Sequence, residues 1–488
     1  MFAVAGRQCA ALFRRRIHLH SCIRDFPESL AQKQPCFPLS SKDVHMLYQP
    51  NQFYSRLLEI IRRARRRIFL SSLYIGSEER ELIGALDTAL HENPGLHVYL
   101  TLDYNRSTRP GPSSPILAIL PLLRNHERRV HVSLFRSPRL NALMAKVIPP
   151  RFNEGWGTWH AKIYGADDEV IISGANLNRS YFTNRQDRYW HFTSQPTLTD
   201  YCFSFLRTVA GFSYQISCSG SVSTEPEIRW PNPSVKPWKI QPLVEHSLST
   251  FQDSQLASTS LPTTCNTTND VLLFPIIQGG QFNIRQEEHT VSMLFDRLAV
   301  HTTPDVPKPH LNLTSGYFSL YRSYQDLILK SSMGCDILVA SPKANGFYGS
   351  PGLSGLIPEG YTLLEQRFMR AVRNAGRDAG SSKNPSNTVR LSEWAREGWT
   401  YHAKGIWLSP SIGSPPILSL FGSTNLNSRS TNLDTELSFV LLTSSEALQK
   451  NLHDEVNGLW NWAMPWRGAN RNVRWRTKTI VGMVDGML

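Results

Sequence analysis

Apolar residues in the first half of the chain recur either at helical spacing or in short unbroken runs. Phe53, Leu57 and Ile61 follow the period of a helix, and the basic run 62–67 closes it. The pattern predicts a helix over 53–61, a strand over 68–74, a helix over 82–90 that ends at Asn93-Pro94-Gly95, and a strand over 96–102. Strands that alternate with helices predict an α/β fold with mostly parallel sheets flanked by helices.

The second half of the chain repeats features of the first. Its apolar run 313–320, helical segment 324–330 and strand-like run 336–340 follow the same order. Residues 154–162 (EGWGTWHAK) match residues 397–404 (EGWTYHAK) with one deletion. Two matching blocks in one order indicate a duplicated unit, so we expect two pseudo-symmetric lobes.

A second pair of strings lies downstream of the first pair in each half. Residues 174–180 (GANLNRS) correspond to residues 422–430 (GSTNLNSRS). The segment 245–269 is rich in Ser and Thr and reads as a linker or insertion. The predicted organisation is a transit peptide or disordered tail (1–30), an N-terminal lobe (45–230), a linker or insertion (231–285) and a C-terminal lobe (286–488).

The paired strings carry side chains that suit phosphate chemistry. Strand alternation would place His160 and Lys162 on one face, where an imidazole can attack phosphorus and an ammonium can bind a phosphoryl oxygen. A fixed ammonium repels a metal ion, so we expect no metal here. We also expect no cofactor. Asp167 is expected to orient the imidazole, and the amides of Asn176 and Asn425 to donate to phosphate oxygens.

The motif His-x-Lys-(x)4-Asp, followed by the GANLNRS string, resembles the phospholipase D superfamily. The resemblance implies that two such motifs meet at one active site between the lobes. The first motif is complete in His160, Lys162 and Asp167. The second motif keeps His402 and Lys404.

Ser409 stands where the second motif of the superfamily has an aspartate. For the orientation of His402 we therefore expect either another carboxylate, Asp434 or Glu436, or none at all. A duplicated scaffold without activity is the remaining reading of Ser409, and the retained His402 and Lys404 argue against it.

Three further strings, 102–109, 343–349 and 401–407, are similar to those of the eukaryotic mitochondrial phosphatidylglycerophosphate synthase family, and the similarity extends from about residue 47 to 442. This resemblance implies transfer of a phosphatidyl group from CDP-diacylglycerol to sn-glycerol 3-phosphate, with release of CMP. In the expected mechanism, His160 forms a phosphohistidine intermediate and His402 protonates the leaving group. The symmetry of the motifs does not identify the nucleophile, and we favour His160 because its motif is complete.

Arg106 and Arg109 follow a predicted strand and are candidates for binding the acceptor phosphate, although surface ion pairs would explain them equally well. Alternatives to the whole assignment are another phosphatidyltransferase or a phospholipase of the same superfamily, or a nucleic-acid phosphodiesterase.

The overall charge and the cysteines limit the class of protein. Lys and Arg number 52 against 39 Asp and Glu, a formal charge of +13, which suits a phosphate-bearing partner. With the family resemblance, we expect contact with an anionic membrane rather than nucleic acid. The seven cysteines include no Cys-x-x-Cys pair, which indicates neither a disulfide framework nor a zinc site.

The first residues read as a targeting segment. Residues 1–24 contain five Arg and no Asp or Glu, interleaved with apolar residues. This composition is typical of a mitochondrial transit peptide, and the alternative is a disordered basic tail. We expect a mitochondrial protein on the matrix side, peripheral to the inner membrane.

Overall fold

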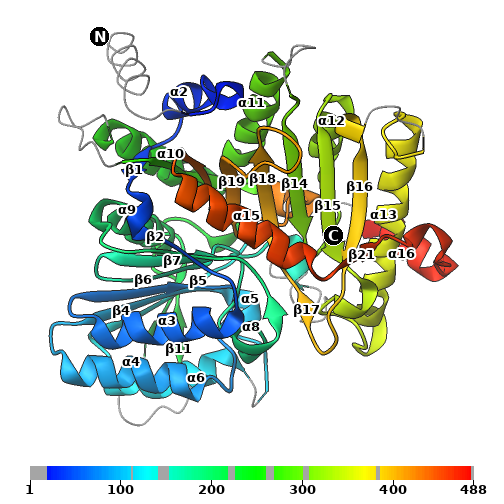
Figure 1. Ribbon diagram of the computed structural model, residues 1–488. Helices are drawn as coiled ribbons and strands as arrows, with labels where there is room; N and C mark the ends of the chain where they lie inside the picture. The colour runs from blue at the N-terminus through cyan, green and yellow to red at the C-terminus, as the bar shows by residue number, and fades with distance from the viewer. Residues whose placement is uncertain are drawn as a thin grey trace.

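The computed structural model describes residues 19–111, 114–140, 153–217, 226–259, 269–300, 307–380 and 385–484. Within these residues the strands form two large sheets, one in each lobe, and a two-stranded ribbon between them. The ribbon pairs β8 (Arg185–Gln186) with β17 (Thr400–Tyr401). Figure 1 shows the N-terminal lobe at the lower left and the C-terminal lobe at the upper right.

The N-terminal sheet has nine strands in the order β11-β10-β5-β4-β3-β6-β7-β9-β2. Only β3, β4 and β5 run parallel, and their neighbours on both sides are antiparallel. The strands are β2 (Val44–Leu47), β3 (Arg67–Ser71), β4 (His97–Asp103), β5 (Val130–Phe135), β6 (Ile163–Ala166), β7 (Glu169–Ser173), β9 (Tyr189–Phe192), β10 (Tyr214–Ser217) and β11 (Glu227–Arg229).

The C-terminal sheet repeats this plan, with β14, β15 and β16 parallel and antiparallel strands on either side. Its order is β1-β12-β20-β19-β18-β14-β15-β16-β21, and β13 pairs with β12. The strands are β1 (Phe37–Leu39), β12 (Val271–Gly279), β13 (Ile284–Arg285), β14 (His310–Ser315), β15 (Gly334–Ala340), β16 (Val389–Trp394), β18 (Lys404–Ser409), β19 (Leu418–Gly422), β20 (Glu436–Thr443) and β21 (Ala463–Pro465).

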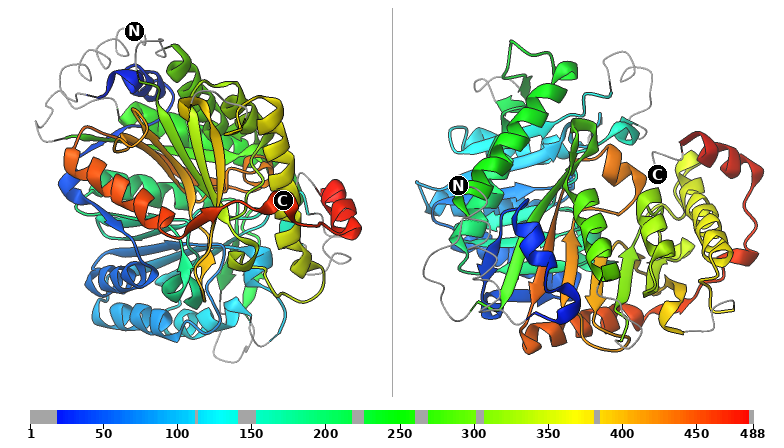
Figure 2. Two further views of the ribbon diagram at one scale, coloured as in Figure 1. Left: turned by 45° about the vertical axis from the view of Figure 1, so that its right-hand side comes forward. Right: turned by 90° about the horizontal axis from the view of Figure 1, so that it is seen from above.

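Helices cover the outer face of each sheet. Helices α3, α4 and α6 pack on the N-terminal sheet around one apolar cluster, and α11, α12 and α13 pack on the C-terminal sheet around another (Figures 1 and 2). The helices are α2 (Phe26–Ala31), α3 (Pro50–Arg63), α4 (Arg80–Glu92), α5 (Tyr104–Ser107), α6 (Pro115–Asn125), α8 (Arg179–Thr183), α9 (Pro196–Ala210), α10 (Gln241–Ser258), α11 (Gln286–Val300), α12 (Arg322–Lys330), α13 (Ile357–Asn374), α14 (Ser428–Asn432), α15 (Glu446–Trp460) and α16 (Trp475–Val484).

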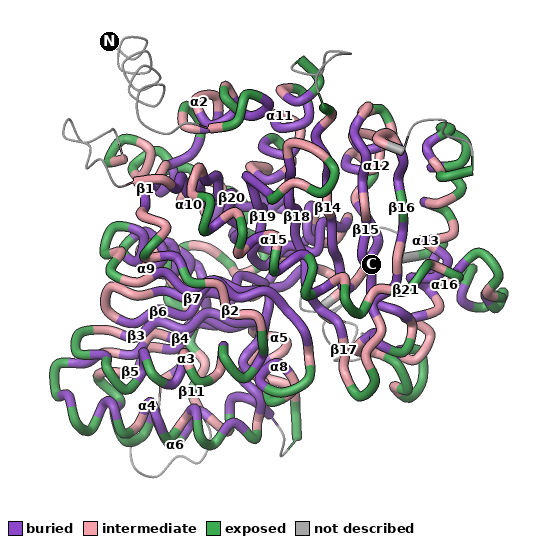
Figure 3. Tube along the Cα trace, viewed as in Figure 1, coloured by how far each residue is buried: buried purple, intermediate pink, exposed green. Residues whose placement is uncertain are grey.

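The inner faces of the two sheets share a third apolar cluster. Residues of both lobes belong to it, and the rings of Trp190 and Phe421 stack across the interface with centroids 4.3 Å apart. Burial of this continuous apolar surface fixes one lobe against the other. The purple core between the sheets in Figure 3 shows this burial. Residues on the loops at this interface are therefore held in defined positions.

The predicted α/β fold with two pseudo-symmetric lobes is confirmed, and two details differ. The sheets are mixed rather than mostly parallel, since apolar runs report burial but not the direction of a neighbouring strand. Within residues 231–285, expected to be a linker or insertion, the structure has the helix α10 and the strand β12, and β12 pairs with β20 of the C-terminal sheet.

The segment assigned to targeting lies mostly outside the described residues, which begin at Leu19. From Phe26, α2 packs against the C-terminal lobe. None of the helices in the described ranges combines the length and apolar character needed to cross a bilayer.

Candidate active site

His160 is held by the opposite lobe. Its backbone N–H donates to the carbonyl oxygen of Thr435 at 2.9 Å, and its Nδ1 lies 2.9 Å from both carboxylate oxygens of Glu436. Burial raises the pKa of Glu436, but the adjacent His160 and Lys162 outweigh it and lower this pKa to about 2. An ionised Glu436 keeps the ring proton on Nδ1, so the lone pair of His160 lies on Nε2.

His402 has the reciprocal arrangement. Its backbone N–H donates to the carbonyl oxygen of Gln186 at 2.8 Å, and its Nδ1 lies 2.6 Å from Oδ2 of Asp187 in the N-terminal lobe. The pKa of Asp187 is lowered, because Lys404 and His402 outweigh the effect of burial. Each motif histidine is thus oriented by a carboxylate from the other lobe.

These two carboxylates occupy equivalent places in the repeat. Asp187 follows Asn176 by 11 residues (187 − 176), and Glu436 follows Asn425 by 11 residues (436 − 425). The sequence analysis did not identify Asp187, although this common spacing was the signal for it. It considered Glu436 only as one possible partner of His402, whereas Glu436 contacts His160.

Asp167 does not orient His160, and that prediction is wrong. Its carboxylate accepts backbone N–H bonds from Arg65 (2.7 Å), Arg66 (2.9 Å) and Arg67 (3.0 Å), at the turn between α3 and β3. The whole length of β6 separates it from the histidine. At about 3.3 Å per residue, a four-residue strand carries Asp167 to the far end of the sheet.

Ser409 stands at the corresponding far end of β18, where it faces His310 of β14 in the strand register. An aspartate at this position would therefore not reach His402. Asp434, the other carboxylate considered for His402, accepts the backbone N–H of Thr158 at 2.8 Å and pairs with Arg429 at 3.1 Å. The missing aspartate of the second motif leaves the orientation of His402 intact.

Both motif lysines are buried in the same cluster. Lys162 Nζ donates to the carbonyl oxygen of His160 at 2.5 Å, and Lys404 Nζ lies 3.2 Å from Asp187. Ser173 and Gly174, which are adjacent in the chain, contact the backbone of Lys162 and the ammonium of Lys404 respectively. The two motifs therefore meet at one place, as the repeat predicted.

The carboxylates beside the two lysines do not fully offset the effect of burial on the lysine pKa values. Burial is the main cause that lowers the pKa of Lys162 to about 7, and the charge of Lys404 adds to it against the opposing effect of Glu436. Burial likewise lowers the pKa of Lys404, although Asp187 opposes it. An anion bound between the two ammonium groups would restore their charge.

The two asparagines differ in their surroundings. Asn176 Oδ1 accepts the backbone N–H of Leu73 at 3.3 Å, and its amide donates to the hydroxyl of Tyr181 at 3.1 Å. That hydroxyl lies 3.3 Å from Nε2 of His402. Asn425 is buried, and within the described part of the chain its Oδ1 has no hydrogen-bond partner.

Arg185 is a cation beside His402 that the sequence analysis did not single out. Its guanidinium lies 4.6 Å from the ring centroid of Tyr181, and its Nε donates to Thr400 at 3.0 Å. Among the residues that the structure describes, no carboxylate pairs with it. By contrast, Arg188 pairs with Glu455 at 2.8 Å.

The predicted acceptor residues lie on and after α5. The guanidinium of Arg106 stacks 4.3 Å from the ring centroid of Tyr74. Burial raises the pKa of Tyr317, and the charge of Arg106 acts against this rise. The ring of Tyr317 lies 5.3 Å from that of His402. Arg109 is half-buried just beyond the end of α5. Arg106 and Arg185 thus border the His402 side of the site.

Two groups of metal-ligand types exist among the described residues. His160, Asp434 and Glu436 form one, but Nδ1 of His160, the hydroxyl of Ser430 and the adjacent Lys162 already satisfy or neutralise Glu436. These donors suit a phosphate site better than a cation site.

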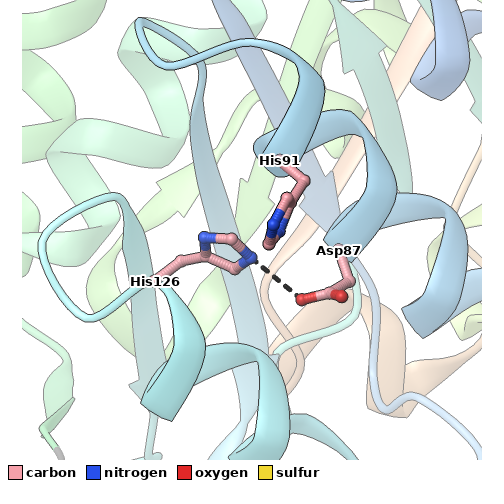
Figure 4. A group of neighbouring side chains, drawn as sticks. All are labelled: Asp87, His91 and His126. Carbon is pink, nitrogen blue, oxygen red and sulfur yellow. Dashed lines mark hydrogen bonds and ion pairs between the residues drawn. The ribbon is translucent and has the colours of Figure 1, made fainter.

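Asp87, His91 and His126 form the second group, at the surface between α4 and α6 (Figure 4). His126 Nε2 lies 2.9 Å from Asp87, and Arg129 donates to His126 Nδ1 at 3.0 Å. A guanidinium only donates, so Nδ1 is the acceptor and Nε2 carries the proton. A metal would need the lone pair on Nε2, so this triad fits a hydrogen-bonded cluster rather than a metal site.

No family model matches the chain. Known proteins are similar to it over most of its length. The chain is 37% identical over 465 residues to the CDP-diacylglycerol–glycerol-3-phosphate 3-phosphatidyltransferase of Schizosaccharomyces pombe, with 86% of this chain and 89% of the relative covered. It is 34% identical over 463 residues to the mitochondrial human protein of the same name, with 87% and 78% covered.

The solved structures support the fold. A phosphatidylserine synthase of Haemophilus influenzae matches with a TM-score of 0.67 at 19% identity, covering 96% of this chain and 98% of that protein. The two chains thus share a fold over nearly their whole length. The relatives at more than one-third identity show that the chain belongs to the CDP-diacylglycerol–glycerol-3-phosphate 3-phosphatidyltransferase family.

Proposed function

We propose that the protein transfers the phosphatidyl group of CDP-diacylglycerol to sn-glycerol 3-phosphate and releases CMP. The names of the relatives give the two substrates. The observation that carries the proposal is the meeting of two imidazole–ammonium pairs, each oriented from the other lobe, in one buried cluster. A phosphoryl group is the substrate that such a pair of motifs fits.

The first half-reaction uses the free nitrogen of His160. Nε2 attacks the phosphatidyl phosphorus, an N–P bond forms, and the P–O bond to CMP breaks. Within the described residues, Nε2 of His160 has no hydrogen-bond partner, whereas Nε2 of His402 contacts the Tyr181 hydroxyl. This difference supports His160 as the nucleophile.

His402 handles the proton in both half-reactions. Burial and the adjacent Lys404 lower its pKa well below the usual value, and a bound pyrophosphate anion would raise it again. Protonated His402 gives its proton to the leaving CMP. It then takes one from the primary hydroxyl of glycerol 3-phosphate as that oxygen bonds to the phosphorus and the N–P bond to His160 breaks. General acid–base help of this kind contributes about 10²–10⁴-fold.

The remaining groups hold the oxygens of the phosphoryl group. Lys162 and Lys404 supply positive charge, and the amides of Asn176 and Asn425 lie in the same buried cluster as donors. Asp187 and Glu436 do not touch the phosphorus and act as positioning residues for the two histidines.

Arg185, together with Arg106, is proposed to bind the phosphate of the acceptor. An uncompensated guanidinium beside His402 would place an anionic acceptor within reach of the base. Arg109 follows in the same segment and is kept as a weaker candidate because its position beyond α5 is the only support. A serine or water acceptor has no phosphate, so this subsite would favour glycerol 3-phosphate over both.

One assay tests the proposed function. Purified protein is given CDP-diacylglycerol with glycerol 3-phosphate, serine or water, and CMP release and the lipid product are measured. We expect phosphatidylglycerophosphate and rapid CMP release only with glycerol 3-phosphate. Phosphatidylserine as the main product, equal rates with water, or cleavage of DNA in place of the lipid nucleotide would each contradict the proposal.

The place of action is proposed from the relatives. Those from human, chicken and cattle are named as mitochondrial proteins. We infer that this chain acts in mitochondria, at the matrix face of the inner membrane and as a peripheral protein. Fractionation followed by protease treatment of inner-membrane vesicles that enclose the matrix face tests this. A protein on the matrix face should be protected, and a protein on the opposite face would be digested.

A further inference from the structure

The N-terminal part of α13 and the segment that precedes it lie near the active site. The ring of Tyr361 lies 5.7 Å from that of Tyr317, whose ring lies 5.3 Å from that of His402. Phe347, in the preceding segment, lies 5.8 Å from Tyr317. The rings of Phe347 and Tyr361 therefore lie next to Tyr317, which in turn contacts His402.

Large apolar side chains are exposed in this segment and on α16. Tyr348 and Leu353 are 57% and 56% exposed, although both lie within ten residues of the start of α13. On α16, Trp475 and Met483 are 71% and 78% exposed. We call these four residues the rim surface.

Helix α16 packs against α13, the helix that follows this segment. Arg474, just before α16, donates to Glu359 of the first turn of α13 at 2.7 Å. Val481 packs with Leu363 of α13 in a small apolar cluster. Figures 1 and 3 show α16 projecting from the C-terminal lobe beside α13, with much of its surface exposed.

The charge around the rim surface is positive. Residues 343–361 and 473–484 contain four cations, Lys343, Arg474, Arg476 and Lys478, and one carboxylate, Glu359, which pairs with Arg474. The guanidinium of Arg476 lies 5.6 Å from the ring centroid of Trp475. Exposed indole and aliphatic side chains flanked by cations fit the interface of an anionic bilayer.

We propose that the rim surface docks on an anionic lipid bilayer and brings the mouth of the active site to the lipid. This inference rests on the proposed function, because a diacyl substrate must be taken from a bilayer. Docking places the exposed side chains before α13 and those on α16 among the headgroups. The lipid nucleotide then needs to rise only far enough for its phosphorus to reach His160.

Vesicle co-sedimentation tests the docking surface. The probe is phosphatidylcholine vesicles with and without cardiolipin, and the variants are Leu353→Ser with Trp475→Ala and, separately, Arg476→Glu. The matched control is Trp238→Ala. Trp238 is 49% exposed, and the ammonium of Lys236 lies 5.6 Å from the centroid of its ring. It shortly precedes α10, which Figure 1 shows on the opposite side of the molecule from α16. Melting temperatures show that each variant is folded.

The double variant is expected to bind cardiolipin vesicles at least about tenfold more weakly, through loss of buried apolar area. Arg476→Glu is expected to weaken binding to cardiolipin vesicles and to leave the weak binding to phosphatidylcholine unchanged. Trp238→Ala should bind as the unaltered protein does. Equal binding by the double variant and the unaltered protein, or an equal loss in Trp238→Ala, would overturn the proposal.

Turnover separates this inference from the proposed function. With a short-chain, water-soluble CDP-diacylglycerol, the double variant should release CMP at the rate of the unaltered protein, whereas with vesicle-borne substrate it should be slower. No CMP release by the unaltered protein from either substrate would defeat the proposed function while leaving the vesicle-binding result to stand. Loss of a dimer in the double variant, seen by light scattering, would assign the rim surface to a second copy of the chain and overturn lipid docking.

Discussion

Glu436 of the C-terminal lobe holds the imidazole of His160 from the N-terminal lobe, with Nδ1 2.9 Å from both carboxylate oxygens. The ring therefore depends on contact between the lobes, and the same is true of His402 on Asp187. Neither half of the repeat contains a complete site. A duplication whose halves exchange carboxylates has to be folded as one unit to act.

Replacement of Glu436 by Gln should lower kcat far more than it changes the KM for CDP-diacylglycerol. Without the carboxylate, the proton is no longer fixed on Nδ1, and Nε2 loses the lone pair needed for attack. A comparable change of tautomer in a catalytic triad costs about 10⁴-fold, so a fall of about 10² to 10⁴ in kcat is expected. Steady-state kinetics checks this, and a kcat within threefold of the unaltered protein would contradict it.

Asp167→Asn should affect stability rather than catalysis. Asn tolerates the left-handed backbone of this residue (φ 51°), but only one of its side-chain atoms can accept the N–H bonds of Arg65, Arg66 and Arg67. Urea unfolding should show a loss of about 1–3 kcal/mol for the lost acceptor. A fall in kcat like that of Glu436→Gln, at unchanged stability, would restore Asp167 to the catalytic machinery.

The pH dependence of kcat/KM should follow Lys162 on its alkaline side. Its pKa of about 7 means that the free enzyme loses a phosphate-binding charge as the pH rises through 7. On the acid side, kcat/KM should fall only at a pH lower than an ordinary imidazole would give, because burial lowers the pKa of His160 and its protonation removes the attacking lone pair. A flat profile between pH 6.5 and 9 would disagree with this assignment.

The variant Lys162→Arg sharpens the pH experiment. A guanidinium stays charged throughout this range, so the alkaline fall should move to higher pH even if the rate at pH 7 is lower. If the alkaline limb stays where it was, another group is responsible for it.

Arg185→Gln should raise the KM for glycerol 3-phosphate by about tenfold or more, the effect of one lost charge-assisted hydrogen bond. The slow release of CMP with water as acceptor should be unchanged, since water does not use the subsite. Arg185→Lys should recover part of the affinity. An increase in the KM for CDP-diacylglycerol with slower hydrolysis would instead place Arg185 on the leaving CMP.

Much of the fold follows from local patterns in the sequence. The predicted helix 53–61 lies inside α3, the strand 68–74 overlaps β3, and the helix 82–90 lies inside α4. The two helices each bury one apolar face and the strand is an unbroken buried run, and both patterns can be read directly from the sequence. The directions of neighbouring strands depend on contacts across the sheet, and those were not predicted.

Part of the candidate site was predictable because its residues stand in the sequence repeat. His160, Lys162, His402 and Lys404 stand in a repeat, and the structure brings them together. Asp187 and Glu436 reach the other lobe's histidine through space, so the local motif suggested Asp167 instead. The 11-residue spacing after each paired asparagine was the one feature of the sequence that marked them.

The most direct test of the account is the covalent intermediate. His402→Ala protein is incubated with CDP-diacylglycerol labelled at the phosphatidyl phosphorus, without acceptor, and the labelled peptide is identified by mass spectrometry; His160→Ala is treated in parallel. We expect label on His160 in the first protein and none in the second. Label on His402 in the His160→Ala protein, or full CMP release with no labelled protein in either, would contradict the central claim.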